Sequence, residues 1–162
     1  MTSYTAAVND PNQAVAVFKG LDVDEQLAFL WFVYEQMGES ITTAAPGSAS
    51  PEIATGLYNQ VKEVDQQEQL DIMRAIAKSD SSSQFSRQYG SLSANTKLAF
   101  WYFLSQGMDS GDIIPMPDDY ELSEQGQDLL AALETMDFEA QITILRDAVV
   151  DMGSEPASGS DI

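Results

Sequence analysis

Alternating helix-start and helix-stop residues divide this chain into short segments whose apolar residues recur at intervals of three and four. Asp10-Pro11 is typical of an N-cap followed by the first helical residue, and Gly20 is typical of a helix stop. Leu27, Leu30 and Trp31 then fall on one helical face. No segment shows the alternation typical of a strand. The sequence therefore predicts an all-α fold with eight helices.

Further signals set the expected boundaries. The other helix-start candidates are Asp22 or Asp24, Ser50-Pro51, Asp65 with Glu68, Ser93, Ser123 and Asp137, and the other stops are Gly38 and Gly153. The small-residue stretch 39–50 and the proline-containing stretch 111–121 are predicted to be loops, and 80–83 is predicted to join the two halves of the chain. Residues 10–153 are expected to form a single domain, with a disordered tail at 154–162.

The two halves of the chain also resemble each other in sequence. Gln26-Leu27-Ala28-Phe29 matches Lys97-Leu98-Ala99-Phe100 after 71 residues, and the pattern from Asp65 to Arg74 matches that from Asp137 to Arg146 after 72 residues. Matches in nearly one register favour two related units of four helices each. We therefore expect an internal repeat of about 72 residues.

Composition excludes several classes of function. The 26 acidic residues against 7 basic ones leave a net charge of −19, which phosphate backbones and anionic membranes would repel. The chain has no cysteine and no histidine, so disulfides, thiolate chemistry, an imidazole base and the usual zinc sites are excluded. The longest apolar run, 27–34, is far below the roughly 20 residues that span a bilayer. The carboxylates near helix starts match the helix dipole, and we expect no enzyme.

Two aromatic clusters are the most unusual feature of the sequence. Phe29, Trp31, Phe32 and Tyr34 crowd one helix, and residues 100–103 crowd the matching helix of the second half. Side chains at such spacing point in all directions, so both helices should be buried on most sides. The simplest interpretation is core packing. Because the clusters occupy equivalent positions, they could also face each other and enclose a long, apolar, roughly symmetric ligand.

Several motifs occur in order: QLAFLWFVYEQMG at 26–38, Ile41-Thr42 and AAPG at 44–47, NTKLAFWY at 95–102, Pro115-x-Pro117-x-x-Tyr120, and QITILR at 141–146 followed by VVDMG at 149–153. This series resembles the N-terminal helical domain of the cyanobacterial orange carotenoid protein family, from about residue 10 to residue 153. The chain is similar to the helical carotenoid proteins, the stand-alone homologues of that domain. The resemblance implies two interleaved four-helix bundles with a carotenoid between them.

The resemblance also implies a class of ligand and the residues that would contact it. The ligand would be a keto-carotenoid of the canthaxanthin, echinenone or 3'-hydroxyechinenone class, with Trp31 and Trp101 beside one terminal ring. The remaining residues implied to contact the pigment are Leu27, Leu30, Tyr34, Met73, Leu98, Tyr102, Met116, Tyr120, Arg146 and Val149. Asn95 and Arg146 would form a partner interface. Arg74 stands where the family commonly has a small uncharged residue near the pigment.

The function implied is photoprotection by physical quenching of singlet oxygen, without bond chemistry. Two alternatives stay open: a quencher that docks to the phycobilisome through Arg146, and a carrier or store that exchanges pigment with a C-terminal-domain homologue. A module without pigment, in which the aromatic side chains are only core, is a further alternative. The expected location is the cytoplasm, with proximity to thylakoid membranes left open.

Overall fold

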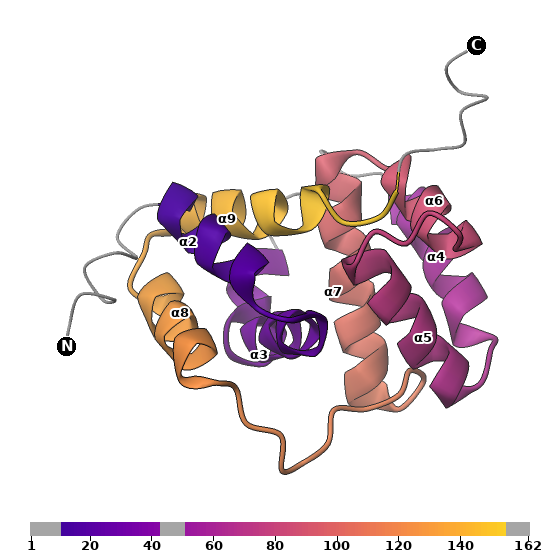
Figure 1. Cartoon of the computed structure of the whole chain (residues 1–162), viewed down its shortest axis with the longest axis horizontal. Coiled ribbons are helices and arrows are strands. Elements are labelled where there is room, and N and C mark those ends of the chain that lie inside the picture. Colours follow the sequence, from indigo (N-terminus) through magenta and orange to yellow (C-terminus); the bar gives the residue numbers. More distant parts are fainter. Residues whose placement is uncertain (1–10, 43–50, 155–162) are drawn as a thin grey trace.

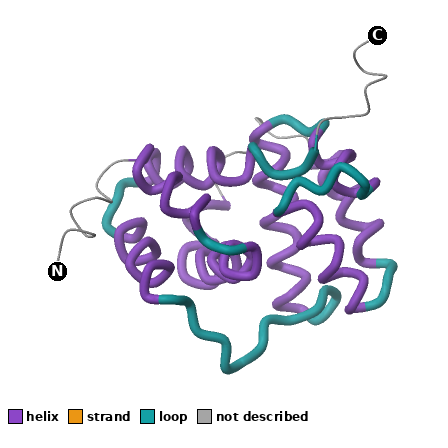
Figure 2. Tube along the Cα trace, viewed as in Figure 1, coloured by secondary structure: helices purple, strands orange, loops and turns teal. Residues whose placement is uncertain are grey.

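The computed structural model describes residues 11–42 and 51–154, and all regular structure in these ranges is helical (Figure 1, Figure 2). The all-α prediction is confirmed. The helices of these ranges are α2 (Pro11–Gly20), α3 (Val23–Thr42), α4 (Pro51–Lys62), α5 (Gln66–Ala77), α6 (Gln84–Gly90), α7 (Ala94–Ser110), α8 (Glu124–Glu134) and α9 (Phe138–Val150).

Side-chain caps start most of these helices. Ser93, Ser123 and Asp137 each accept a hydrogen bond from the backbone N–H three residues later, at 3.2, 3.1 and 2.9 Å. Asp22 and Asp65 do the same for α3 and α5, both at 2.9 Å. Each cap satisfies a backbone donor that the helix itself leaves unpaired. The predicted starts at these positions are confirmed.

The boundary prediction was wrong in two places. Gly38 does not end its helix, because α3 continues to Thr42. A glycine inside a helix costs only about 1 kcal/mol relative to alanine, which the flanking helical turns offset. The last helix ends at Val150, before Gly153, which has φ of +79°. The segment 111–121 is non-helical as predicted. The signals at Asp10 and Ser50, the segment 43–50 and the tail from 155 lie outside the described residues.

The helices form two groups. One group contains α2, α3, α8 and α9, and the other contains α4, α5, α6 and α7 (Figure 1). The first group therefore joins the early and late parts of the chain, with the middle of the chain forming the second group, so the groups are interleaved as expected. Helix α7 connects them because it packs against α4, α3 and α9.

The order of helices agrees with the expected repeat without establishing it. Helices starting at Pro11, Val23, Pro51 and Gln66 are followed by helices starting at Gln84, Ala94, Glu124 and Phe138. The internal repeat stays a prediction from the sequence.

The core lies along α7 and its neighbours. Phe100 and Leu104 of α7 are almost fully buried, as are Phe29 of α3 and Ile144 of α9. Helices α4 and α7 approach closely at Gly107, which has no side chain to separate them. Within the described ranges, no helix combines the length and apolarity needed to cross a membrane.

This close approach gives a stability prediction. A methyl group added at Gly107 would collide with the Tyr58 hydroxyl and with Cγ1 of Ile113. We expect Gly107→Ala to lower the free energy of unfolding by about 1–3 kcal/mol, the usual cost of overpacking, measured by urea denaturation. The control is Gly56→Ala on α4, where an added methyl meets no atom of the described residues within 4 Å. That variant should gain about 0.5–1 kcal/mol. Equal stability of the two variants would contradict the close approach.

Candidate functional site

A cavity of about 290 Å³ lies between the two helix groups. Its walls come from α3, α5, α7 and the non-helical residues 111–123, which we call the strap. The lining is mainly apolar: Leu27, Ala28, Leu30, Leu70, Met73, Trp101, Leu104, Met108, Ile114, Pro115, Met116 and Pro117, with Asp24, Arg74, Ser105 and Tyr120 as the polar members. This composition suits an apolar ligand with few polar groups.

The cavity runs from a buried floor to a hydrated rim. On the floor, Leu30, Trp101 and Leu104 are 7, 4 and 1% exposed. At the rim, the side chains of Arg74 and Asp24 are 40 and 54% exposed. The cavity therefore presents apolar side chains in its buried part and a charged pair at its exposed rim.

The strap is attached to the helices on both sides of the cavity. Near its start, the buried Gln69 of α5 accepts from the Ile114 N–H at 2.8 Å and donates to the Asp112 carbonyl at 3.2 Å. At its end, Glu25 of α3 accepts from the Tyr120 hydroxyl at 2.9 Å and from the Ser123 hydroxyl at 2.8 Å. The apolar residues 114–117 are thereby held as one wall of the cavity.

The orientation of Trp101 is set by a buried tyrosine. The Trp101 indole N–H donates to the Tyr89 hydroxyl at 2.9 Å, and that hydroxyl donates to the Val149 carbonyl at 2.7 Å. Tyr89 is fully buried, and this desolvation raises its pKa well above the ordinary value, so the hydroxyl remains a donor. The indole that forms part of the cavity floor is thus tied to the end of α9.

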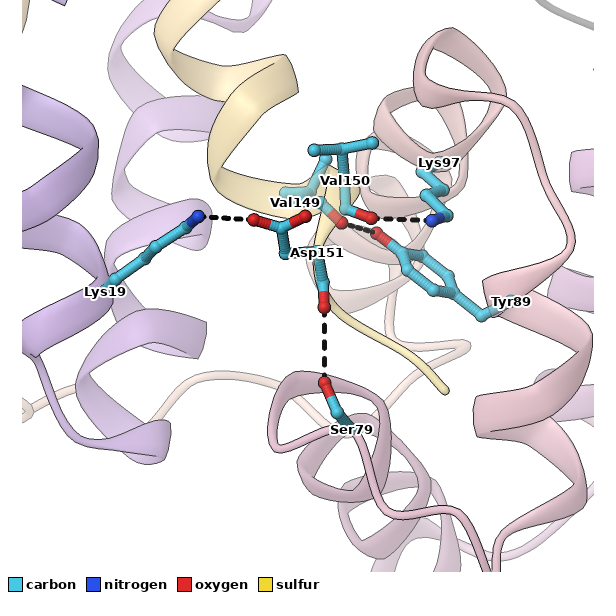
Figure 3. Close-up of polar contacts among 7 residues, drawn as sticks. All are labelled: Lys19, Ser79, Tyr89, Lys97, Val149, Val150 and Asp151. Carbon is cyan, nitrogen blue, oxygen red and sulfur yellow. Dashed lines mark hydrogen bonds and ion pairs between the residues drawn. The ribbon is translucent and has the colours of Figure 1, made fainter. Parts of the chain in front are cut away.

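Other side chains hold the same end of α9 (Figure 3). Lys97 donates to the Val150 carbonyl at 2.6 Å, Ser79 donates to the Asp151 carbonyl at 3.3 Å, and Lys19 pairs with the Asp151 carboxylate. The last carbonyls of a helix have no partners within it. Here the partners come from other elements, which ties the end of α9 to α2 of its own group and to α7 of the other group.

Comparison with known proteins identifies the family. A family model described as "Orange carotenoid protein, N-terminal" matches residues 4–155. The chain belongs to this orange carotenoid protein family. An orange carotenoid-binding domain-containing protein of Nostoc sp. (strain PCC 7120) is 50% identical over 142 residues, covering 88% of this chain and 82% of the relative.

Two solved structures share the fold. The Red Carotenoid Protein of Anabaena (Nostoc) sp. PCC 7120, solved binding canthaxanthin, is 48% identical with a TM-score of 0.81, and the match covers 90% of this chain and 99% of that one. The Orange Carotenoid Protein of the same organism, also solved with canthaxanthin, is 34% identical with a TM-score of 0.81. That match covers 98% of this chain and 53% of the longer protein, so this chain spans about half of it.

Within this family fold, half of the pigment-contact residues expected from the sequence line the cavity. They are Leu27, Leu30, Met73, Trp101, Met116 and Tyr120. Trp31, Tyr34 and Tyr102 do not line it and form a separate aromatic cluster, with ring centroids 5.6 Å apart for Trp31–Tyr34 and 5.4 Å for Tyr34–Tyr102. Helices α3 and α7, which carry the two aromatic clusters, therefore face each other here. The interpretation in which the clusters enclose a ligand required this arrangement.

Tyr34 belongs instead to a second, wider hollow of about 620 Å³. This hollow is more open and includes the polar side chains of Asn59, Gln106 and Asp109. The Tyr34 hydroxyl donates to Asp109 at 3.2 Å, and burial together with that carboxylate raises the pKa of Tyr34. The polar lining makes this hollow a poorer match for an apolar ligand than the cavity under the strap.

The three other expected contact residues lie elsewhere. Val149 is buried in the core, Leu98 packs against the core, and Arg146 donates to the Asn95 side chain at 3.3 Å. None of the three lines the cavity. The two predicted interface residues, Asn95 and Arg146, are thus direct neighbours, while their contact with a partner stays a prediction.

Sequence reasoning missed several lining residues. Leu104, Ser105 and Met108 follow Trp101 at helical spacing, which could have placed them on the same face. Tyr89, Gln69 and Glu25 had no local signal, because their roles depend on contacts with distant segments. Among the described residues, no group of acidic, histidine or cysteine side chains could hold a metal ion.

The Tyr89 contacts give a prediction for stability. Tyr89→Phe keeps the ring but leaves the buried Trp101 N–H and the Val149 carbonyl without this partner. We expect the free energy of unfolding to fall by about 1–3 kcal/mol, the usual cost of unpaired buried polar groups, measured by urea denaturation. Tyr58→Phe serves as the control, because Tyr58 is only half-buried and has no such bond to α9. A loss no larger in Tyr89→Phe than in Tyr58→Phe would contradict the assignment.

The strap gives a prediction for alkaline pH. Burial, the hydrogen bond to Glu25 and the nearby carboxylates raise the pKa of Tyr120 to about 12, above the value near 10 in an unfolded chain. The neutral hydroxyl is therefore favoured by folding, and its contribution is full below about pH 10 and lost between about pH 10 and 12. We expect Tyr120→Phe to lose stability less steeply than wild type over this interval in urea denaturation.

The control for this experiment is Phe138→Leu, because Phe138 is 41% exposed, does not titrate and lies outside the cavity lining. It should retain the wild-type dependence on pH. If Tyr120→Phe also retained it, the Tyr120–Glu25 attachment would not be a stabilising contact of the strap.

Proposed function

We propose that this chain binds a keto-carotenoid in the cavity under the strap and acts as a photoprotective quencher of singlet oxygen. The observation that carries the proposal is a largely apolar cavity with Trp101 on its floor, set between interleaved helix groups. Relatives of the same fold were solved with canthaxanthin bound. A keto-carotenoid, when bound, accepts the excitation energy of singlet oxygen and releases it as heat.

The lining residues fit such a ligand. The apolar floor of Leu30, Trp101 and Leu104 would hold the polyene by removing it from water, at roughly 25 cal/mol per Å² before the ordering costs are subtracted. The cavity of about 290 Å³ is smaller than a whole carotenoid, so only part of the ligand would lie inside it. Met73, Met108 and Met116 line it, and flexible thioethers adapt well to such a partial fit.

The chain's own contribution would be to disperse, hold and shield the pigment. The charge of −19 keeps copies of the protein apart in water. The Tyr89–Trp101 bond would keep the floor in one arrangement, and the strap would limit the access of water. No residue is assigned a bond-making role, and the family relatives are named for carotenoid binding.

A second proposed function is pigment exchange with a C-terminal-domain homologue. It is favoured by the position of Asn95 and Arg146, which lie side by side on α7 and α9 and are both partly exposed. Docking to the phycobilisome and a location in the cytoplasm stay predictions. Transfer of the visible absorption band to a purified C-terminal-domain homologue would support exchange, and its retention by this chain would contradict it.

Singlet-oxygen quenching is tested with canthaxanthin-loaded protein. We expect loaded wild type to shorten the near-infrared phosphorescence lifetime of singlet oxygen relative to pigment-free protein. Met116→Trp should fill the cavity from the strap and lower the pigment bound by about fivefold or more, since most of the buried apolar contact is lost. Phe138→Trp is the matched control, because Phe138 is 41% exposed and outside the cavity lining.

Two results would contradict the proposal separately. Equal loading of Met116→Trp and Phe138→Trp would remove the cavity as the binding site. An unchanged lifetime with fully loaded wild type would remove quenching as the function while leaving pigment binding in place.

A further inference from the structure

The rim of the cavity carries one ion pair, formed between α5 and the start of α3. Arg74 donates from Nε to Asp24 Oδ1 at 2.9 Å and from Nη2 to Asp24 Oδ2 at 3.2 Å. This bidentate geometry fixes the plane of the guanidinium more firmly than a single bond would. Both side chains line the cavity.

The pair still leaves donors available at the rim. A guanidinium carries five N–H groups and no acceptor, and the two bonds to Asp24 use only some of them. Arg74 Nη1 makes no hydrogen bond to the described residues. The other polar groups of the lining are less suited, because the Tyr120 hydroxyl already donates to Glu25 and Ser105 is buried on α7.

The charges around the rim favour a neutral acceptor. The charge of Arg74 is balanced by Asp24, and Asp71 also acts on Arg74 electrostatically. A ligand ending in a carboxylate would meet these acidic groups, whereas a carbonyl oxygen accepts a hydrogen bond without carrying a charge. Because Arg74 and Asp24 line the same cavity as the apolar floor, a ligand whose apolar body lay on the floor could bring a terminal group to them.

We infer that Arg74, held in place by Asp24, donates a hydrogen bond to the ring carbonyl of the bound carotenoid and thereby selects keto-carotenoids over hydrocarbon carotenoids. This inference rests on the proposed function, because it assigns a specificity role within the proposed pigment site. Asp24 is the positioning residue, and Arg74 is the residue that touches the ligand.

The test is competition between canthaxanthin and β-carotene, a hydrocarbon carotenoid, for the full chain. Wild type should prefer canthaxanthin, and Arg74→Met should lower the ratio of bound canthaxanthin to bound β-carotene about fivefold, the effect of one modest hydrogen bond. Methionine keeps an unbranched apolar stem but has no N–H donor. Lys78→Met, just beyond the end of α5, is the control for loss of one positive charge and should retain the wild-type ratio.

A spectroscopic readout separates hydrogen bonding from a structural role. A hydrogen bond to a carbonyl conjugated with the polyene changes its visible absorption band. The band of bound canthaxanthin should therefore differ between wild type and Arg74→Met, while that of bound β-carotene should be the same in both. Asp24→Asn, which loosens the guanidinium but keeps it, should lower the ratio less than Arg74→Met does.

Three outcomes would overturn the inference. An unchanged ratio in both variants, or equal losses of both pigments, would show that Arg74 is not a keto-specific contact, while pigment binding by wild type would keep the proposed function. If wild type bound neither pigment, the proposed function would fail and this inference with it.

Discussion

The buried hydroxyl of Tyr89 is the contact on which the floor of the site depends. An indole N–H and a helix-terminal carbonyl both lose water when they are buried, and each needs a partner. The Tyr89 hydroxyl serves both, since it accepts from Trp101 at 2.9 Å and donates to Val149 at 2.7 Å. It thereby joins α6, α7 and α9 and orients the ring that faces the cavity.

The opposite wall is built differently. The strap has no regular structure, and its position depends on the side chains of Gln69 and Glu25, which bond to its start and end. A cavity with a rigid helical floor and a wall attached by a few polar contacts can hold an apolar ligand firmly and still admit it. The adaptable Met116 lies in that wall.

Local rules predicted much of the fold. Caps such as Ser93, Ser123 and Asp137 act on backbone groups three residues away, so the sequence alone was enough to place these helix starts. Gly38 failed as a stop because glycine only weakens a helix that its neighbours support. For the site, Leu27, Leu30 and Trp101 were expected from the family resemblance and line the cavity. Tyr89, Gln69 and Glu25 were not, because their partners are 60, 45 and 95 residues away in the chain.

We propose that this chain holds a keto-carotenoid between its two helix groups. The most direct measurement is the visible absorption spectrum of the protein purified from cells that produce canthaxanthin. We predict a coloured protein whose red-shifted pigment band elutes together with the polypeptide in size exclusion. A colourless, stably folded protein, after several keto-carotenoids had been offered, would contradict pigment binding. The aromatic clusters would then serve only as core packing.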